Sequence, residues 1–321
     1  MDALPLELHA QIFEFACTDD GSTARSLFLV SRYVRDIAAP YLYQSLAIAG
    51  LEQMHELVAR LDVTPPHLRR IRHLFLSDWT HTQTKDRVVG TSDEAQDRYE
   101  AERILALRIL AFAASTVETL AVTVSCPFTG PPILGALFSS PMPRLTELSV
   151  HGFYPFPHTP RSMPRLESLH LSGNRNPHGL LQLGALDAAC PTLTHLRVSG
   201  LVAAASFAEE LRSAIIHRED DANAHLSPLS ASIPPALQCV AIEVRQLQSM
   251  VPRKTGVSRG MRLMHDKMLA SLRELEGREE PTRYPRVIVA EKSEDSDMYS
   301  ALKQDWLDGL TTPLEPLTPC S

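Results

Sequence analysis

The sequence of 321 residues lacks the patterns that mark an enzyme or a metalloprotein. It contains no HExxH, no CxxC pair, no GxSxG, no P-loop and no dinucleotide-binding glycine fingerprint. Its 13 histidines are not grouped at the spacing of zinc ligands. We therefore expect no catalytic residues, no metal site and no cofactor, and the chain is not predicted to be an enzyme.

Cysteine, long apolar runs and excess positive charge are also scarce. Five cysteines are scattered along the chain, which is typical of reduced thiols in the cytoplasm or nucleus. No apolar run approaches the roughly 18 residues of a membrane span, and no charged-then-apolar leader follows Met1. The formal charge is −7 and residues 1–63 contain no lysine, which disfavours nucleic acid or an anionic membrane as a partner. The composition favours a soluble cytoplasmic or nuclear protein.

What is present first is a helical hairpin in the opening 40 residues. Pro5 suits the first turn of a helix, and the stretch "TDDGST" at 18–23 ends it. A second helix runs to Pro40, after which "YLYQSLAI" has the chemistry of a strand. The hairpin therefore precedes a different kind of structure.

Each helix of this hairpin carries more apolar residues than one stripe needs. The residues expected to pack within the hairpin are Leu8, Ile12, Phe15 and Ala16 in the first helix and Leu27, Val30, Val34, Ile37 and Ala38 in the second. The surplus residues are Leu6, Phe13, Phe28 and Leu29. They meet either the following part of the chain, so that the hairpin is only a cap, or another protein.

The same stretch resembles an F-box, the helical module of substrate receptors in cullin-type ubiquitin ligases. The matching pieces are Leu4-Pro5 followed by Glu7, then Ile12 and Phe13, then "LFLVSRYVRDIAAPYLYQSL". The version present here is similar to F-box-like proteins that are abundant in mushroom-forming fungi. One position departs from the pattern, because Val34 stands where many F-boxes have tryptophan.

The resemblance implies two partners, a Skp-type adaptor and, through it, a cullin scaffold. Carried over by position, it implies an adaptor interface made of Leu4, Pro5, Ile12, Phe13, Leu29 and Val30.

The rest of the chain repeats a short pattern of three apolar residues with two and then one residue between them. The copies are "IRHLFL" at 71, "VETLAV" at 117, "LTELSV" at 145, "LESLHL" at 166, "LTHLRV" at 193 and "LQCVAI" at 237. Helix-forming segments lie between several of them, as at 94–113 and 203–217. This alternation predicts an α/β fold, with a stacked solenoid that has a parallel sheet on its concave face. It also resembles the leucine-rich repeats that commonly follow F-boxes.

An ordinary α/β sheet protein is the alternative, since buried parallel strands also read as apolar clusters. A doubly wound sheet usually carries a glycine-rich phosphate loop after its first strand, and only Gly50 is present there. We therefore favour the irregular leucine-rich-repeat solenoid.

The residues between the apolar positions of each copy are expected on the concave face, because side chains alternate along a strand. They form a ladder rich in histidine and serine that is a candidate surface for a protein target. Its proposed binding residues are His73, Phe75, His151, His170, His195 and Arg197. The alternative is a strand face that is merely solvated. The histidines suggest that the affinity for a target changes near pH 6.5.

Four regions are expected: an adaptor-binding module at 1–45, a degenerate repeat array at 46–250, a helical capping region at 251–310 and a disordered tail at 311–321. The predicted function is that of a substrate receptor of a cullin-type ubiquitin ligase. The alternative is a repeat scaffold for protein interactions without a ligase.

Overall fold

The computed structural model describes residues 4–79, 92–183, 185–217, 231–247, 258–277, 285–292 and 298–311. The predicted disordered tail at 311–321 lies largely outside these residues. The chain divides into two compact units, residues 1–129 with 297–321, and residues 130–296.

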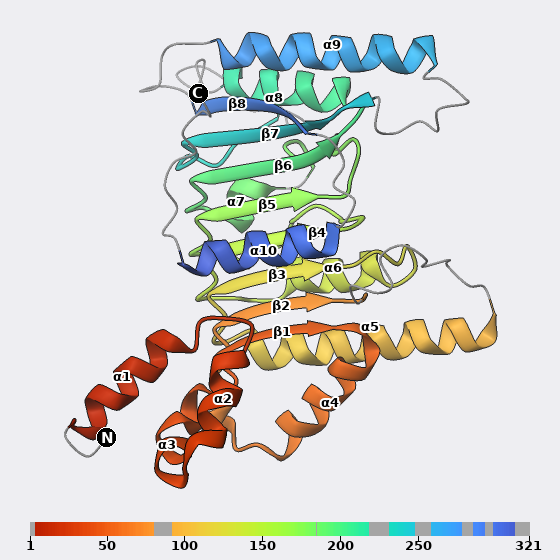
Figure 1. Cartoon of the computed structure of the whole chain (residues 1–321). Helices are drawn as coiled ribbons and strands as arrows, with labels where there is room; N and C mark the ends of the chain where they lie inside the picture. The colour runs from red at the N-terminus through yellow and green to blue at the C-terminus, as the bar shows by residue number, and fades with distance from the viewer. Residues whose placement is uncertain are drawn as a thin grey trace. The chain divides into compact units, whose positions relative to one another are not determined.

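The first unit begins with a small helical module and continues with three strands, each followed by a helix or a loop (Figure 1). Its elements are α1 (Leu6–Ala16), α2 (Ser22–Val30), α3 (Arg32–Ala38), η1 (Ala39–Tyr41), β1 (Ser45–Ala49), α4 (Gly50–Val63), η2 (Pro66–Leu68), β2 (His73–Ser77), α5 (Asp93–Ala113), β3 (Thr119–Thr123) and α10 (Met298–Thr311).

The second unit contains five strands that alternate with helices or loops. Its elements are α6 (Gly130–Ser139), β4 (Glu147–His151), β5 (Ser168–Ser172), α7 (Leu186–Ala189), β6 (His195–Leu201), α8 (Ala205–His217), β7 (Cys239–Arg245), α9 (Arg259–Glu276) and β8 (Arg286–Lys292). The sequence predicts a single capping region over 251–310, and its described parts belong to both units.

All strand pairs within each unit are parallel, and the order of the strands follows the chain. Each of the six predicted motifs contains a strand, from "IRHLFL" in β2 to "LQCVAI" in β7. The α/β class and the parallel strands are thus confirmed. The arrangement is consistent with a solenoid of the leucine-rich-repeat kind.

Four strands of the second unit, β4 to β7, are each preceded by the same kind of turn. The N–H of a leucine donates to the carbonyl three residues earlier, as from Leu166 to Met163 at 3.3 Å and from Leu193 to Cys190 at 3.2 Å. A proline follows the accepting residue in both turns and sets the backbone angle that a β-turn requires. This explains why each strand starts at the same point of its repeat.

Backbone hydrogen bonds at the start of each strand set its register with the next strand. The carbonyl of Thr146 accepts the N–H groups of Glu167 and Ser168, at 2.8 and 3.0 Å, and the carbonyl of Glu167 accepts those of Thr194 and His195, both at 2.9 Å. The apolar second residue of each strand is thereby aligned with its neighbours and buried, in the row Leu148, Leu169, Leu196, Val240 and Val287. Burying each such side chain contributes about 2 kcal/mol.

Glycine is required directly after β5. Gly173 has a φ of +94°, and a Cβ there would lie 2.6 Å from the backbone nitrogen of Gly152. A side chain at this position would therefore push neighbouring repeats apart.

The predicted hairpin is a three-helix module. Ser31 adopts an extended conformation and interrupts the second predicted helix, which becomes α2 and α3. Its hydroxyl accepts the N–H of Val34 at 3.2 Å and so caps α3. The prediction of one continuous helix up to Pro40 is therefore wrong.

None of the described helices is long and apolar enough to span a bilayer.

Candidate functional site

The small core of the helical module is made of Phe13, Val34, Ile37 and Ala38. Leu27 and Phe28 pack against its edge. His9 is also buried, and its Nδ1 lies 3.3 Å from the hydroxyl of Tyr33. The module therefore uses one face of α1 for its own packing.

A second face of α1 remains exposed. Leu8, Ile12 and Phe15 recur at i, i+4 and i+7, so they lie along one side of the helix. Phe15 is 80% exposed and Ile12 is 50% exposed. We call Leu8, Ile12 and Phe15 the apolar stripe.

Most of the residues that the sequence assigns to the adaptor interface are exposed as well. Leu4, Pro5, Ile12, Leu29 and Val30 are on the surface, and Leu29 is 84% exposed. Phe13 is only 7% exposed, so its assignment to a free surface is wrong. It points into the core of the module because it lies about 100° around the helix from Ile12.

The stripe predicted to pack inside the hairpin is wrong for α1, whereas Val34, Ile37 and Ala38 of the stripe predicted for the second helix are buried, with Leu27 packed against them. Leu8, Ile12 and Phe15 face outward while Phe13 is buried. Val30 is exposed because α2 ends there and the break at Ser31 changes the direction of the chain. Leu8 and Phe15 are thus candidate binding residues that the sequence assigned to packing.

The module is joined to the first strands by polar contacts. The side-chain amide of Gln44 donates to the carbonyls of Glu14 and Cys17 at the end of α1, at 2.7 and 3.2 Å. Arg72, just before β2, pairs with Glu14 and with Glu118, both at 2.8 Å. These contacts fix the C-terminal end of α1 against the strands.

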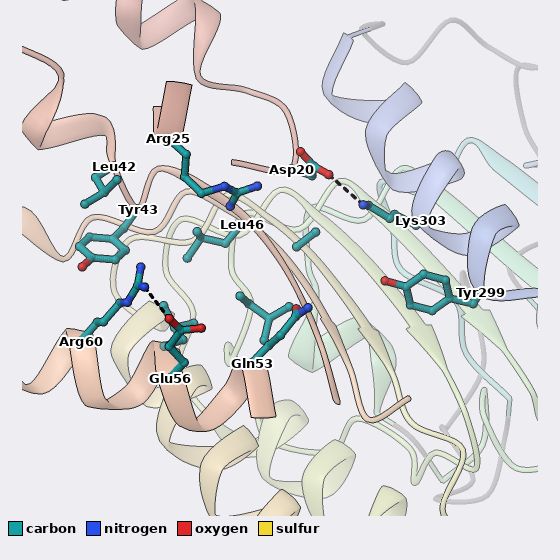
Figure 2. A pocket seen from close by; sticks show the side chains of 13 residues that line it. Asp20, Arg25, Leu42, Tyr43, Leu46, Gln53, Glu56, Arg60, Tyr299 and Lys303 are labelled. Atoms are coloured by element: carbon teal, nitrogen blue, oxygen red, sulfur yellow. Dashed lines mark hydrogen bonds and ion pairs between the residues drawn. The ribbon is translucent and has the colours of Figure 1, made fainter. Parts of the chain in front are cut away.

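A cavity of about 400 Å³ lies beside β1 in the first unit (Figure 2). Asp20 from the α1–α2 loop and Lys303 from α10 form an ion pair of 2.9 Å at its wall. Burial alone would raise the pKa of Asp20, but the hydrogen bond and charge of Lys303 lower it below its usual value. Figure 2 also shows the ion pair between Glu56 and Arg60. Tyr299 lines the cavity from the side of α10.

In the second unit, polar side chains at alternating strand positions, counted from the first residue of each strand, form a connected row on one face. We call the face to which these side chains point in each unit the strand face. His170 Nε2 lies 2.7 Å from Ser199 Oγ, which lies 3.0 Å from Glu243 Oε2. Glu243 also pairs with Arg197 at 2.8 Å and with Lys292 at 3.0 Å. Sequence reasoning missed Glu243 and Lys292, because they lie in the fifth and seventh positions of strands whose motifs are the least regular.

Four of the six predicted target-binding residues belong to this second unit. His170 and Arg197 are in register on β5 and β6, and Ser168 is in register with His195. His151 on β4 is in register with Ser172, and its Nδ1 lies 2.9 Å from the Ser172 hydroxyl. The predicted ladder of alternating strand positions is therefore present in this unit.

Three of the predicted histidines, His73, His151 and His170, have pKa values below the range that the sequence suggested. Burial lowers the pKa of His73 to about 4 and that of His151 to about 4, and the charges of Arg72 and Arg245 act in the same direction. Burial and then the charge of Arg197 lower the pKa of His170 well below its ordinary value. The hypothesis of a switch near pH 6.5 is wrong for these three residues.

Glu243 keeps its negative charge in this row. Burial alone would raise its pKa, but the charge of Arg197 and the hydrogen bond and charge of Lys292 lower it. The row thus combines neutral imidazoles with one paired carboxylate, which suits hydrogen bonding to a polar protein surface.

The two predicted target-binding residues of the first unit differ from these four. Phe75 has no exposed surface, because Trp306, Tyr299 and other side chains of α10 cover it together with Ala121. Its assignment to a free target-binding surface is wrong. His73 is partly buried on the same strand, and its Nδ1 has no hydrogen-bond partner among the described residues.

Within the described ranges, no group of three histidine, cysteine, aspartate or glutamate residues is arranged to hold a metal ion. The chain matches no protein-family model, and no curated protein is similar to it in sequence.

Proposed function

We propose that this chain is the substrate receptor of a cullin-type ubiquitin ligase. Its front module, residues 1–45, binds a Skp-type adaptor that connects it to a cullin scaffold. Its strands present a protein target. Such a receptor works in the cytoplasm or nucleus and needs no cofactor.

The single observation that carries this proposal is the exposed apolar stripe on α1. A three-helix module of this size has little apolar area to spare, yet Phe15 and Leu29 are each at least 80% exposed. Large apolar side chains grouped on a small module are typical of a surface that a second protein covers. The family resemblance in the sequence names the adaptor as that protein.

The contacts at the base of the module support the second half of the proposal. Arg72 and Gln44 fix α1 to the strands of the first unit, so a target held on β1 to β3 keeps a set position relative to the adaptor. A receptor of this kind adds no chemical group. It raises the effective concentration of a target lysine near the activated ubiquitin.

Co-purification of the full chain with a Skp-type adaptor tests the first half. We expect the wild-type chain to retain the adaptor and the double variant Ile12→Asp, Phe15→Asp to lose it at least tenfold, because two charges would be placed in an apolar interface. Gln11→Asp is the matched control. Gln11 is exposed on the same helix, and the substitution adds one charge beside the apolar stripe.

Failure of the wild-type chain to retain the adaptor would refute the ligase assignment. The alternative scaffold role, with the module acting only as a cap, predicts that outcome. Equal retention by the wild type and the double variant would instead show that the adaptor binds elsewhere.

A further inference from the structure

The two strand faces differ at the third residue of their strands, which is apolar in β1 to β3 and polar in β4 to β6. The central row of β1 to β3 is Ala47, Phe75 and Ala121, which are in register. The central row of β4 to β6 is Ser149, His170 and Arg197. The first row is unsuited to contact with water and requires an apolar partner.

Helix α10 is the partner present in this chain. The helix is amphipathic, and its apolar face packs on Phe75, Ala47 and Ala121. In Figure 1 it crosses the near side of the strands. Among the side chains of α10 at 299–310, Trp306 is the one that is buried, with 5% of its surface exposed. The apolar contacts around it are Tyr299, Leu302, Leu307 and Leu310.

This packing has the form of a docked helical ligand. Tyr299, Leu302, Trp306 and Leu310 recur at i, i+3, i+7 and i+11, with one aromatic anchor and partly exposed neighbours, which is how helical peptides bind grooves. The ring of Phe75 lies 5.7 Å from that of Tyr299 at nearly a right angle and 5.8 Å from that of Trp306. Lys303 adds the ion pair to Asp20.

The fit of α10 is incomplete. The indole N–H of Trp306 is buried without a hydrogen-bond partner among the described residues. An unsatisfied buried donor weakens an interaction relative to one in which the donor is paired. A helix from another protein that satisfied this region better would compete with α10.

We propose that the strand face of β1 to β3 is a helix-binding surface and that α10 occupies it as an exchangeable internal ligand. The partner it fits is a target protein that presents an amphipathic helix with a bulky aromatic residue, apolar residues four positions before and after it, and a lysine three positions before it. Such a target gains access by displacing α10. This inference rests on the proposed target-binding role of the strands, and it specifies the class of target.

Exchange can be measured with the chain's own helix as the probe. The probe is a fluorescein-labelled peptide of residues 298–311, and its anisotropy is recorded with full-length proteins. Trp306→Ala in the full chain removes the anchor of the internal helix. We expect this variant to bind the peptide at least tenfold more tightly than the wild-type chain, in which the internal copy competes at high effective concentration.

Two controls make the result specific. Gln304→Ala alters the exposed side of α10 and should behave as the wild type. A peptide carrying Trp306→Ala should not bind the variant chain. Absence of peptide binding to a folded Trp306→Ala chain would overturn the proposal.

A second measurement applies if Trp306→Ala fails to fold. Lys303→Glu removes the ion pair to Asp20 without touching the buried anchor, and we expect it to increase peptide binding by a smaller factor. Hydrogen exchange of the wild-type chain should show faster exchange in α10 than in β2 and β3. Equal protection of α10 and β2 would show that the helix is a fixed part of the core.

None of these measurements involves the adaptor. A chain that binds the peptide but not the adaptor would keep the helix-binding surface and lose the ligase function. The opposite result would leave the ligase function and remove this class of target.

Discussion

Phe13 and Ile12 are neighbours in α1 with opposite surroundings. The Phe13 ring packs with Val34 and Ile37 in the module core. Half of the Ile12 side chain is open to solvent. One step along a helix rotates the side chain by about 100°, so one of two adjacent apolar residues packs in the core while the other lies on the surface.

This separation predicts different effects of truncating the two side chains. Phe13→Ala should lower the free energy of unfolding of the module by about 3 kcal/mol, because it leaves a cavity in a core with few members. Ile12→Ala should change it by no more than about 0.5 kcal/mol, because the side chain is exposed. Urea denaturation of the full chain followed by circular dichroism compares them. Similar losses for both variants would contradict the assignment of faces.

At the scale of elements, Ser31 determines how the front module ends. Its extended backbone separates α2 from α3, and its hydroxyl caps α3 through the N–H of Val34. The sequence carries the signal for this break, since serine is a preferred first residue of a helix. The signal lies inside a stretch of regular apolar spacing, which predicts a continuous helix.

Ser31→Ala should destabilise the module by about 1 kcal/mol, because the N–H of Val34 loses its acceptor. It should also weaken the proposed adaptor binding, since the position of Leu29 and Val30 depends on the break. Ser26→Ala is the matched control within α2, where the exposed serine hydroxyl bonds only to Ser22 of the same helix. Thermal unfolding and co-purification measure the two effects. A loss as large for Ser26→Ala would show that the capping contact is not responsible.

For the whole molecule, the strands were predictable and the position of α10 was not. The motif at residue 166 predicts β5 because its apolar spacing and its turn proline are local features. The same holds for the row of side chains around His170 and Arg197, which follows from strand alternation. The amphipathic pattern of 298–311 predicts that α10 has a buried face. It does not predict that this face packs on Phe75, which lies more than 200 residues earlier in the chain.

The buried histidines predict how the stability of the whole chain depends on pH. His73 and His151 bind a proton below about pH 6.5 in the unfolded chain, but only near pH 4 in the folded one. The unfolded state therefore binds more protons between these values. The free energy of unfolding should fall as the pH is lowered from 6.5 to 4, by up to about 1.4 kcal/mol per pH unit for each histidine.

Urea denaturation at a series of pH values measures this dependence. His151→Asn should flatten the slope of the unfolding free energy between pH 6.5 and 4, because one buried imidazole is removed. His55→Asn, at an exposed position on α4, is the control. An unchanged slope in the His151 variant would show that its imidazole takes up its proton equally in both states.

The cover over Phe75 has a consequence for biosynthesis. Ribosomes make β1 to β3 long before residues 298–311 emerge, so a growing polypeptide displays this phenyl ring and its alanine neighbours throughout most of its translation. Chaperones that recognise aromatic segments have that interval in which to hold the nascent chain. An mRNA truncated before codon 298 encodes a product that lacks α10. Phe75 and its alanine neighbours then stay exposed, and chaperones or proteases can recognise this apolar surface.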